Sequence, residues 1–337
     1  MAADAGQSPA ATVDLSVIVP VFNEEESIPL FLEAVPPILR ELGLAHEIIF
    51  IDDGSSDRTC AVVEAASREN PNVRLIQLSR NFGKEAAMTA GLEWAAGGAV
   101  IPMDVDLQDP PELIRDFVRL WREGYDVVYG QRVSRESDTG TKRMSAGLFY
   151  RIFNKMSDTK IHPNVGDYRL MSRAAVDATL TLRERNRFMK GIFAWVGFRS
   201  IAVPYERPVR AAGTTKFNYW RLWNFALDGI TSFSTIPLRI WTYVGLTVAA
   251  AAIVYMVTII LRTWMFGSDV PGYASLMVVL LLLGAIQLIS LGVIGEYLSR
   301  LYVESKQRPI YYVQRSLGFP AHSSREAAPP PARHARA

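Results

Sequence analysis

The sequence has few cysteines and histidines and almost no excess of basic residues. Its single cysteine, Cys60, excludes an intrachain disulfide framework and fits a reducing compartment. The four histidines lie far apart in the 337 residues and show no zinc-ligand spacing. The 36 Lys and Arg nearly balance the 34 Asp and Glu, and the resulting net charge of +2 argues against a nucleic-acid-binding protein. A hydrophobic share of 49% excludes a mainly disordered chain.

Two nucleotide-binding motifs and a signal peptide are also missing. No GxGxxG sequence follows the first apolar segment, which argues against a dinucleotide-dependent oxidoreductase. No GxxxxGK(S/T) sequence is present, which excludes a P-loop enzyme. The first 14 residues carry Asp4 and Asp14 and lack an apolar core, unlike a signal peptide. We therefore expect a flexible N-terminus at 1–12 and a soluble region over the N-terminal two-thirds of the chain.

Residues 15–132 alternate between strand-like and helix-like patterns. The strand-like segments are 15–21, 47–52, 73–78, 99–103 and 126–129, and the helix-like segments between them are 27–42, 59–69, 84–96 and 111–123. This alternation predicts a Rossmann-like α/β fold with a doubly wound, mostly parallel sheet. Ligands of such sheets bind outside the carboxyl ends of the strands.

Polar side chains follow each predicted strand at that edge. Asp104 and Asp106 follow one strand and would repel each other unless a cation lay between them. Together with Gln108 they supply the hard oxygen ligands that suit Mg²⁺ or Mn²⁺. A magnesium ion with few protein ligands completes its shell with water and substrate phosphates. The pattern therefore indicates a metal-assisted site for a nucleotide diphosphate.

Several polar residues at this edge also have a purely structural interpretation. Asp53-Gly54 is a common turn, and Ser56 or Asp57 could cap the next helix, so that Ser55, Ser56 and Asp57 would have a structural role and no role in binding. Asp109 before Pro110 could likewise cap a helix.

Two uncharged runs near the C-terminus, 240–261 and 273–295, differ in kind from the rest of the chain. Each is long enough for a membrane span, which needs about 20 apolar residues. The alternative, a pair of buried core helices, rarely stays uncharged over this length. The short connection 262–272 predicts a hairpin. Cations flank the hairpin on its outer sides at Arg221, Arg239, Arg300, Lys306, Arg308 and Arg315. The positive-inside rule therefore predicts both termini in the cytoplasm.

The segment before the hairpin is rich in aromatic residues. In 216–233, KFNYWRLWNFALDGITSF, aromatic and apolar residues recur at helical spacing, which favours a helix lying in the membrane interface. The alternative is an ordinary helix packed on the soluble domain. Residues 143–154 could form a second interfacial helix.

The ordered motifs resemble those of a known enzyme family. The strings VIVPVFNEEESI, IDDGSSDRT, SRNFGKEAAMTAGL and DVDLQDPPE resemble the inverting family-2 glycosyltransferases with a GT-A fold. With GDYRLMSR at 166–173 and AGTTKFNYWRL at 212–222, the chain resembles the polyprenyl-phosphate glycosyltransferases, which include bactoprenol glucosyltransferases and dolichyl-phosphate mannose synthases. The two-helix hairpin is similar to the bacterial bactoprenol branch. The resemblance covers residues 13–315, and Val105 stands where the family usually has a small residue.

This resemblance implies a domain plan. It comprises a GT-A catalytic domain at 13–212, an interfacial amphipathic region at 213–236, a transmembrane hairpin at 237–303 and a cytoplasmic tail at 304–337. The spans of the hairpin are expected at about 240–263 and 273–297. The end of the tail is rich in Ala, Pro and Arg and is expected to be disordered.

The resemblance also implies a reaction and a set of site residues. The reaction is transfer of a hexose, with inversion, from a nucleotide-diphosphate sugar to polyprenyl phosphate, with UDP-glucose as the favoured donor and Mg²⁺ or Mn²⁺ as cofactor. The implied donor contacts are Pro20, Asn23, Glu24, Asp52, Asp53, Lys84 and Asp104. The implied metal ligands are Asp104, Asp106 and Gln108. Catalytic roles fall to Asp106, Arg132 and Asp167, and the acceptor phosphate would be held by Arg143, Arg169, Arg207, Arg210 and Lys216.

Asp167 lies at the position of the family's proposed general base. A phosphate monoester has a second pKa of about 6 and is largely ionised at neutral pH, so it hardly needs a base. Asp167 could instead orient Arg169 or the acceptor.

Other functions remain to be weighed against this one. A processive polysaccharide synthase of the same superfamily would carry a QxxRW motif and more membrane helices, and neither is present. A dolichyl-phosphate-mannose-type synthase would use GDP-mannose instead. A catalytically silent membrane scaffold is the third alternative. We expect an enzyme of the bacterial inner membrane that is a homo-oligomer and has no nucleic-acid partner.

Overall fold

The computed structural model describes residues 13–133, 164–185, 187–206, 236–267 and 272–319. These residues belong to two units, which we describe separately. The first unit contains the described residues up to 206 together with 309–319, and the second contains the remainder, from 236 to 308. Both predicted interfacial helices, and the candidate phosphate contacts Arg143, Arg207, Arg210 and Lys216, lie outside the described residues.

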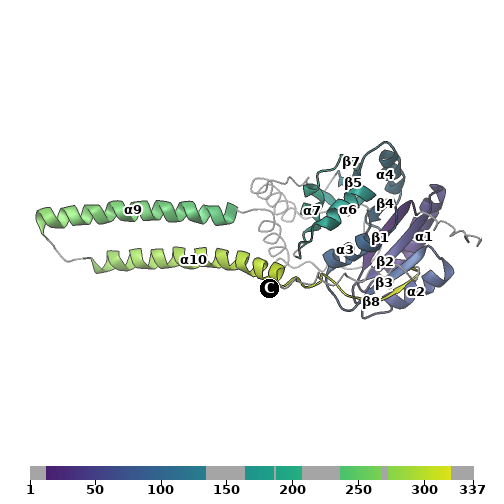
Figure 1. Cartoon of the computed structure of the whole chain (residues 1–337), viewed down its shortest axis with the longest axis horizontal. Coiled ribbons are helices and arrows are strands. Elements are labelled where there is room, and N and C mark those ends of the chain that lie inside the picture. Colours follow the sequence, from purple (N-terminus) through teal and green to yellow (C-terminus); the bar gives the residue numbers. More distant parts are fainter. Residues whose placement is uncertain (1–12, 134–163, 186, 207–235, 268–271, 320–337) are drawn as a thin grey trace, which may run out of the picture. The chain divides into compact units, whose positions relative to one another are not determined.

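The first unit is built on an eight-stranded sheet with the order β7-β5-β6-β4-β1-β2-β3-β8 (Figure 1). Its strands are β1 (Leu15–Val21), β2 (His46–Asp52), β3 (Val73–Leu78), β4 (Ala99–Pro102), β5 (Val127–Arg132), β6 (Val165–Ser172), β7 (Ser200–Tyr205) and β8 (Val313–Leu317). The pairs β1–β2, β1–β4, β2–β3 and β5–β7 are parallel, whereas β6 and β8 run antiparallel to their neighbours. The predicted mostly parallel sheet is thus confirmed.

Helices cover both faces of this sheet. They are α1 (Ser27–Glu41), α2 (Thr59–Glu69), α3 (Lys84–Trp94), α4 (Leu113–Arg122), α6 (Arg173–Thr181) and α7 (Met189–Trp195). Successive side chains of a strand point to opposite faces. Val19 of β1 therefore joins a buried cluster with Phe31 of α1 and Phe117 of α4, while its neighbour Ile18 packs at Gly91 of α3. The four helices predicted between residues 27 and 123 each begin and end within two residues of those observed.

β6 is a central strand that the alternation of residues 15–132 did not predict. It runs antiparallel between β4 and β5, pairing Val100 with Met171 and Val128 with Leu170. Because β6 runs in the opposite direction, it begins at the edge where β4 and β5 end. Gly166 and Asp167 are thereby brought to the carboxyl edge of the sheet.

β8 comes from the segment that the sequence analysis assigned to a cytoplasmic tail. It pairs antiparallel with β3, so residues after the hairpin complete the edge of the sheet. Beyond it, the ring of Phe319 lies edge-on to Trp94 at 4.9 Å, with the Arg74 guanidinium 5.2 Å from the same ring. The backbone of β3 has free hydrogen-bonding groups at the sheet edge, and β8 pairs with them. No local pattern in 304–337 predicts this pairing, so the sequence analysis assigned β8 to the tail.

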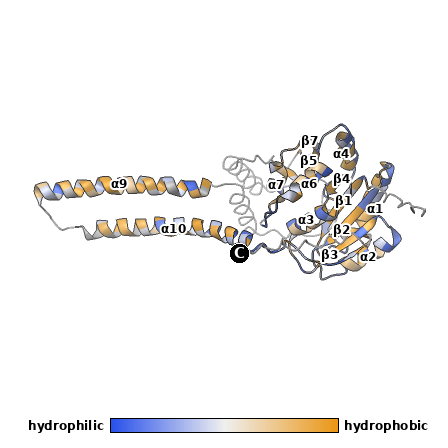
Figure 2. Cartoon of the chain, viewed as in Figure 1, coloured by the Kyte–Doolittle hydropathy of each residue, from blue (hydrophilic) through white to orange (hydrophobic). Residues whose placement is uncertain are grey.

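The second unit contains two long helices, α9 (Ile236–Phe266) and α10 (Tyr273–Ser305), which lie side by side (Figure 1). Apolar residues recur along both (Figure 2), and both are long and apolar enough to cross a membrane. The hairpin that the sequence predicted is therefore confirmed, with helices that extend beyond the expected spans.

Candidate active site

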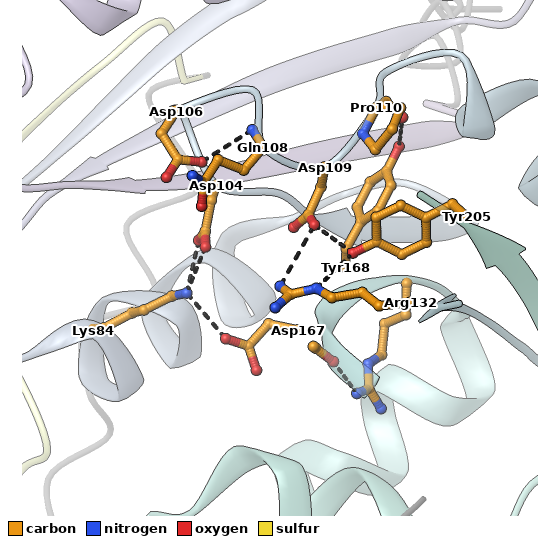
Figure 3. A network of polar contacts seen from close by, with 12 residues as sticks. Lys84, Asp104, Asp106, Gln108, Asp109, Pro110, Arg132, Asp167, Tyr168 and Tyr205 are labelled. Atoms are coloured by element: carbon orange, nitrogen blue, oxygen red, sulfur yellow. Dashed lines mark hydrogen bonds and ion pairs between the residues drawn. The ribbon is translucent and has the colours of Figure 1, made fainter. Parts of the chain in front are cut away.

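The centre of the site is an ammonium group shared by two carboxylates (Figure 3). Lys84, the first residue of α3, lies 2.7 Å from Asp104 after β4 and 3.0 Å from Asp167 on β6. Although burial alone would lower the pKa of Lys84, the two carboxylates raise it. The lysine therefore stays charged and joins residues from three separate elements.

Asp167 is held in its ionised form. Burial would raise its pKa, but Lys84, Lys190 and Arg169 together bring it well below the usual range. A carboxylate with a depressed pKa is a weak proton acceptor. The Oδ1 atom of Asp167 is buried and has no hydrogen-bond partner, as is common where a ligand or water is to be bound.

The predicted metal ligands lie on a sharp turn after β4. The backbone N–H of Gln108 donates to Asp106 Oδ1 at 3.2 Å, and Leu107 between them has a φ of 53°, in the left-handed region. Non-glycine residues rarely adopt this region, and such strain concentrates at functional sites. Within the described part of the chain, no three His, Cys, Asp or Glu side chains gather as a metal cluster. The carboxylates of Asp104 and Asp106 are hard oxygen ligands, so they fit a divalent metal that takes its other ligands from phosphate and water.

Arg132 ends β5 and reaches the same edge. Its Nε donates to the hydroxyl of Tyr205 at 3.1 Å, and its Nη2 lies 3.7 Å from Asp109 Oδ1. Burial would lower the pKa of Arg132, but Tyr205, Asp109 and Asp104 raise it. The structure thus gathers Lys84, Asp104, Arg132 and Asp167, as the resemblance implied.

The ends of β1 and β2 are tied together by their loops. Asn23 has a φ of 55°, its N–H donates to Ser55 Oγ at 2.9 Å, and its Oδ1 accepts from the Ser56 N–H at 2.8 Å. Glu24 accepts from the hydroxyl of Ser27 at 2.7 Å, and Pro20 is partly buried near the end of β1. These residues border the edge at which the nucleoside contacts were predicted.

Asp52 and Asp53 are buried and already hydrogen-bonded within the protein. Asp52 Oδ1 accepts from the Ser55 N–H at 3.1 Å, and Asp52 Oδ2 accepts from the thiol of Cys60 at 3.0 Å. The Asp53 carboxylate accepts from the N–H groups of Phe82 and Gly83 at 2.7 and 2.8 Å. Burial nevertheless raises the pKa of Asp53. Both acids hold the loops that precede α2 and α3 in place.

Comparison with known proteins identifies the family to which the chain belongs. Residues 16–180 match the glycosyl transferase family 2 domain, and residues 236–301 match the GtrB C-terminal hairpin. A Shigella phage SfV protein named bactoprenol glucosyl transferase is 50% identical over 89% of this chain and 98% of its own length. The chain belongs to glycosyltransferase family 2. The Escherichia coli prophage bactoprenol glucosyl transferase homolog is 51% identical over 89% of this chain and 98% of its own length.

A more distant likeness is found among solved structures. Glucosyl-3-phosphoglycerate synthase from Mycobacterium tuberculosis, in complex with Mn²⁺ and UDP-glucose, shares 19% identity and a TM-score of 0.43. The match covers 66% of this glycosyltransferase and 78% of that chain, a similarity too low to carry over its ligands.

Arg169, a predicted phosphate contact of the glycosyltransferase, is buried within the fold. Its Nη2 donates to the Gly166 carbonyl at 2.8 Å, and its guanidinium lies 4.2 Å from the ring centre of Phe193. Burial lowers the pKa of Arg169 to about 10. Arg169 and Asp167 lie close enough for their opposite charges to interact, which favours the alternative that Asp167 orients Arg169.

Neither of the helix caps proposed from the sequence, Asp57 and Asp109, directly precedes its helix. Asp57 accepts a hydrogen bond at 3.0 Å from the N–H of Thr59, the first residue of α2, but Arg58 directly precedes the helix, so Asp57 is not its N-cap. The Asp109 interpretation is wrong, because Glu112 precedes α4 and the Asp109 carboxylate accepts from the hydroxyl of Tyr205 at 2.5 Å.

Two residues near the site were missed from the sequence. Tyr205, at the end of β7, bonds both Arg132 and Asp109. Glu85 accepts from the Met189 N–H at 3.3 Å, and burial followed by the charge of Asp167 raises its pKa to about 7. Glu85 lies inside a quoted motif, whereas Tyr205 is the last residue of a strand-like segment, 200–205, that was not recognised as part of the sheet.

Proposed function

We propose that this glycosyltransferase transfers glucose from UDP-glucose to the phosphate of a polyprenyl lipid, with inversion at the anomeric carbon. The observation that carries the proposal is the identity of about half the residues, over nearly the full chain, to proteins named as bactoprenol glucosyl transferases. A match that includes the hairpin also supports a lipid acceptor, because both helices are apolar enough to lie in the bilayer with it.

The chemistry at the donor follows from the charges at the sheet edge. Mg²⁺ or Mn²⁺ held by Asp104, Asp106 and Gln108 would stabilise the negative charge that develops on the leaving diphosphate. Lys84 and Arg132 add fixed positive charge beside these ligands. The nucleoside would lie over the tied ends of β1 and β2, where Pro20, Asn23, Glu24, Asp52 and Asp53 are found.

The acceptor needs orientation more than deprotonation. A lipid phosphate oxygen, ionised at neutral pH, attacks the anomeric carbon as the bond to the UDP oxygen breaks. The depressed pKa of Asp167 makes this residue a poor base. Asp167 therefore acts by holding Lys84, so that the reactants meet in line. An α-linked donor then gives a β-linked product.

The cellular setting is part of the proposal. The two apolar helices fit a multi-pass protein of the bacterial inner membrane, and the cations that flank them favour cytoplasmic termini and a cytoplasmic catalytic domain. A homo-oligomer stays a prediction. The product would serve the modification of cell-envelope glycans.

The test uses the full chain purified in detergent, with Mg²⁺, undecaprenyl phosphate and a mixture of UDP- and GDP-sugars. Mass spectrometry should detect a single hexose on the lipid phosphate and depletion of UDP-glucose. Depletion of GDP-mannose would replace the donor with that of a dolichyl-phosphate-mannose-type synthase. Neither adduct nor binding of any nucleotide sugar would favour the silent scaffold.

The metal assignment has its own test. Asp106→Ala removes one of the two carboxylates, and we expect metal-dependent turnover to fall by about 100-fold or more while the melting temperature stays near that of the wild type. The matched control is Asp116→Ala, which removes an exposed carboxylate that pairs with Arg119 on α4. Wild-type turnover in Asp106→Ala would refute the assignment.

A further inference from the structure

Tyr205 connects two strand ends that meet at the site (Figure 3). β5 and β7 are parallel, and their last residues, Arg132 and Tyr205, are register partners. The Tyr205 hydroxyl accepts from Arg132 Nε at 3.1 Å and donates to Asp109 Oδ1 at 2.5 Å. Tyr205 and Asp109 are only 6% and 4% exposed. The hydroxyl therefore has both of its partners inside the protein.

Two glycines make room for this arrangement. A Cβ atom on Gly130 would lie 2.8 Å from Cε1 of Tyr205, so the ring crosses β5 where no side chain intervenes. A Cβ atom on Gly166 would lie 3.4 Å from Nη2 of Arg132, so the guanidinium lies close above the start of β6. The Tyr205 ring thus packs against the backbone at Gly130, and the Arg132 guanidinium packs against the backbone at Gly166.

The bond at Nε restricts how Arg132 can turn. An arginine fork presents its donors in a fixed plane, so a bond at one nitrogen sets the direction of the others. Burial and Asp109 raise the pKa of Tyr205 to about 12, which keeps the hydroxyl protonated as a donor to Asp109 at physiological pH. The remaining Arg132 donors lie on the side of the site that carries Asp104 and Asp167 (Figure 3).

We propose that Tyr205, supported by Asp109, is a positioning residue that orients the Arg132 guanidinium toward a phosphate group of the reaction. This inference rests on the proposed function, because it requires a substrate phosphate to bind where β5 and β7 end. The phosphate belongs either to the nucleotide sugar or to the lipid, and the two are distinguished by which KM changes.

The first variant is Tyr205→Phe, which removes the hydroxyl and keeps the ring. Loss of a hydrogen bond to a charged group predicts a fall in kcat/KM of about 10- to 100-fold. Tyr311→Phe is the matched control, because the Tyr311 hydroxyl also donates to a carboxylate, that of Glu93, away from Arg132. This control should stay within about 3-fold of the wild type. A KM increase for one substrate alone assigns the phosphate.

A double-mutant cycle separates positioning from general structural support. Arg132→Lys removes the Nε donor, so Tyr205→Phe should cost no further activity in that background. If the two effects multiply instead, or if Tyr205→Phe behaves like Tyr311→Phe, the proposal is overturned. Should Tyr205→Phe lack a cooperative melting transition, Asp109→Asn takes its place in the cycle, with a smaller loss in the same direction.

Failure of this inference can be told apart from failure of the proposed function. If the wild type forms no glycosylated lipid, the cycle is repeated on the Kd values for UDP-glucose and for undecaprenyl phosphate in detergent. Non-additive weakening of one Kd by Tyr205→Phe and Arg132→Lys supports the positioning role even then. Unchanged Kd values in both variants overturn it.

Discussion

At the scale of single residues, the charge on Lys84 decides what Asp167 can do. The ammonium pairs with Asp104 and Asp167 at 2.7 and 3.0 Å and keeps the pKa of Asp167 low. A residue that is ionised at all physiological pH values cannot serve as an efficient proton acceptor near neutrality. This is consistent with an acceptor that arrives already ionised, and it favours orientation over base catalysis.

Glu85 gives a pH-dependent prediction at the same scale. Burial, and then Asp167, raise its pKa from 4.5 to about 7, so the folded protein binds this proton more tightly than the unfolded chain. Stability should therefore fall as the pH rises from about 4.5 to about 7 and then level off, by about 3 kcal/mol at most. Melting temperatures in detergent from pH 5 to pH 8 should show this fall, and Glu85→Gln should remove it.

The control for Glu85→Gln is Glu33→Gln, which neutralises an exposed glutamate on α1. That variant should keep the pH dependence of the wild type. An unchanged fall in Glu85→Gln would mean that another group binds the proton.

At the scale of elements, β8 makes the chain after the hairpin part of the sheet. Ser79 donates to the Tyr312 carbonyl at 2.9 Å, and Arg315 donates to Gln77 at 2.6 Å and pairs with Glu64 at 3.2 Å. β3 leads directly into the loop whose N–H groups bind Asp53 and then into Lys84. The pairing with β8 therefore supports the strand from which the site lysine follows.

Two truncations test the contribution of β8. Ending the chain after Arg308 removes β8 and the Phe319 contact, and should destabilise the first unit by about 2 kcal/mol through lost apolar burial and ring contacts. For a domain of this size the melting temperature should fall by roughly 4–8 °C. Ending the chain after Phe319 keeps these contacts and should leave the melting temperature unchanged. Equal melting temperatures of the two truncations would contradict the supporting role.

At the scale of the whole molecule, the hairpin divides the chain into parts with different surroundings. α9 and α10 expose large apolar side chains along their length, as membrane helices do, whereas the strands and helices of the first unit bury apolar side chains against one another. The polar site residues thus belong to the first unit, and the long apolar helices α9 and α10 belong to the second.

The single cysteine allows the orientation of the hairpin to be measured. Burial and the neighbouring Asp52 raise the pKa of Cys60 to about 12, so its thiol should stay unreactive. We expect Asp269→Cys to react with a membrane-impermeant maleimide in intact cells, and Ser305→Cys to react only after lysis. The wild type is the background control, and the reverse pattern would place the termini outside.

The local elements could be predicted well because their determinants lie within short windows. Short apolar strand-like segments that alternate with helix-like segments predicted β1 to β5 and α1 to α4, and uncharged length predicted α9 and α10. The ordered motifs predicted the family. Strands β6, β7 and β8 were not predicted, because they lie outside residues 15–132, over which strand and helix patterns were recognised.

Short stretches of the sequence thus predict the first five strands and four helices, two further helices that suit a membrane, and the polar residues that follow those strands. Only the tertiary structure decided which of those residues meet. The pairing of Lys84 with Asp167 exists because β6 enters antiparallel between β4 and β5, and the pairing of Arg132 with Tyr205 exists because β7 lies beside β5. Strand order is set by the packing of the whole sheet, which no short stretch of sequence encodes.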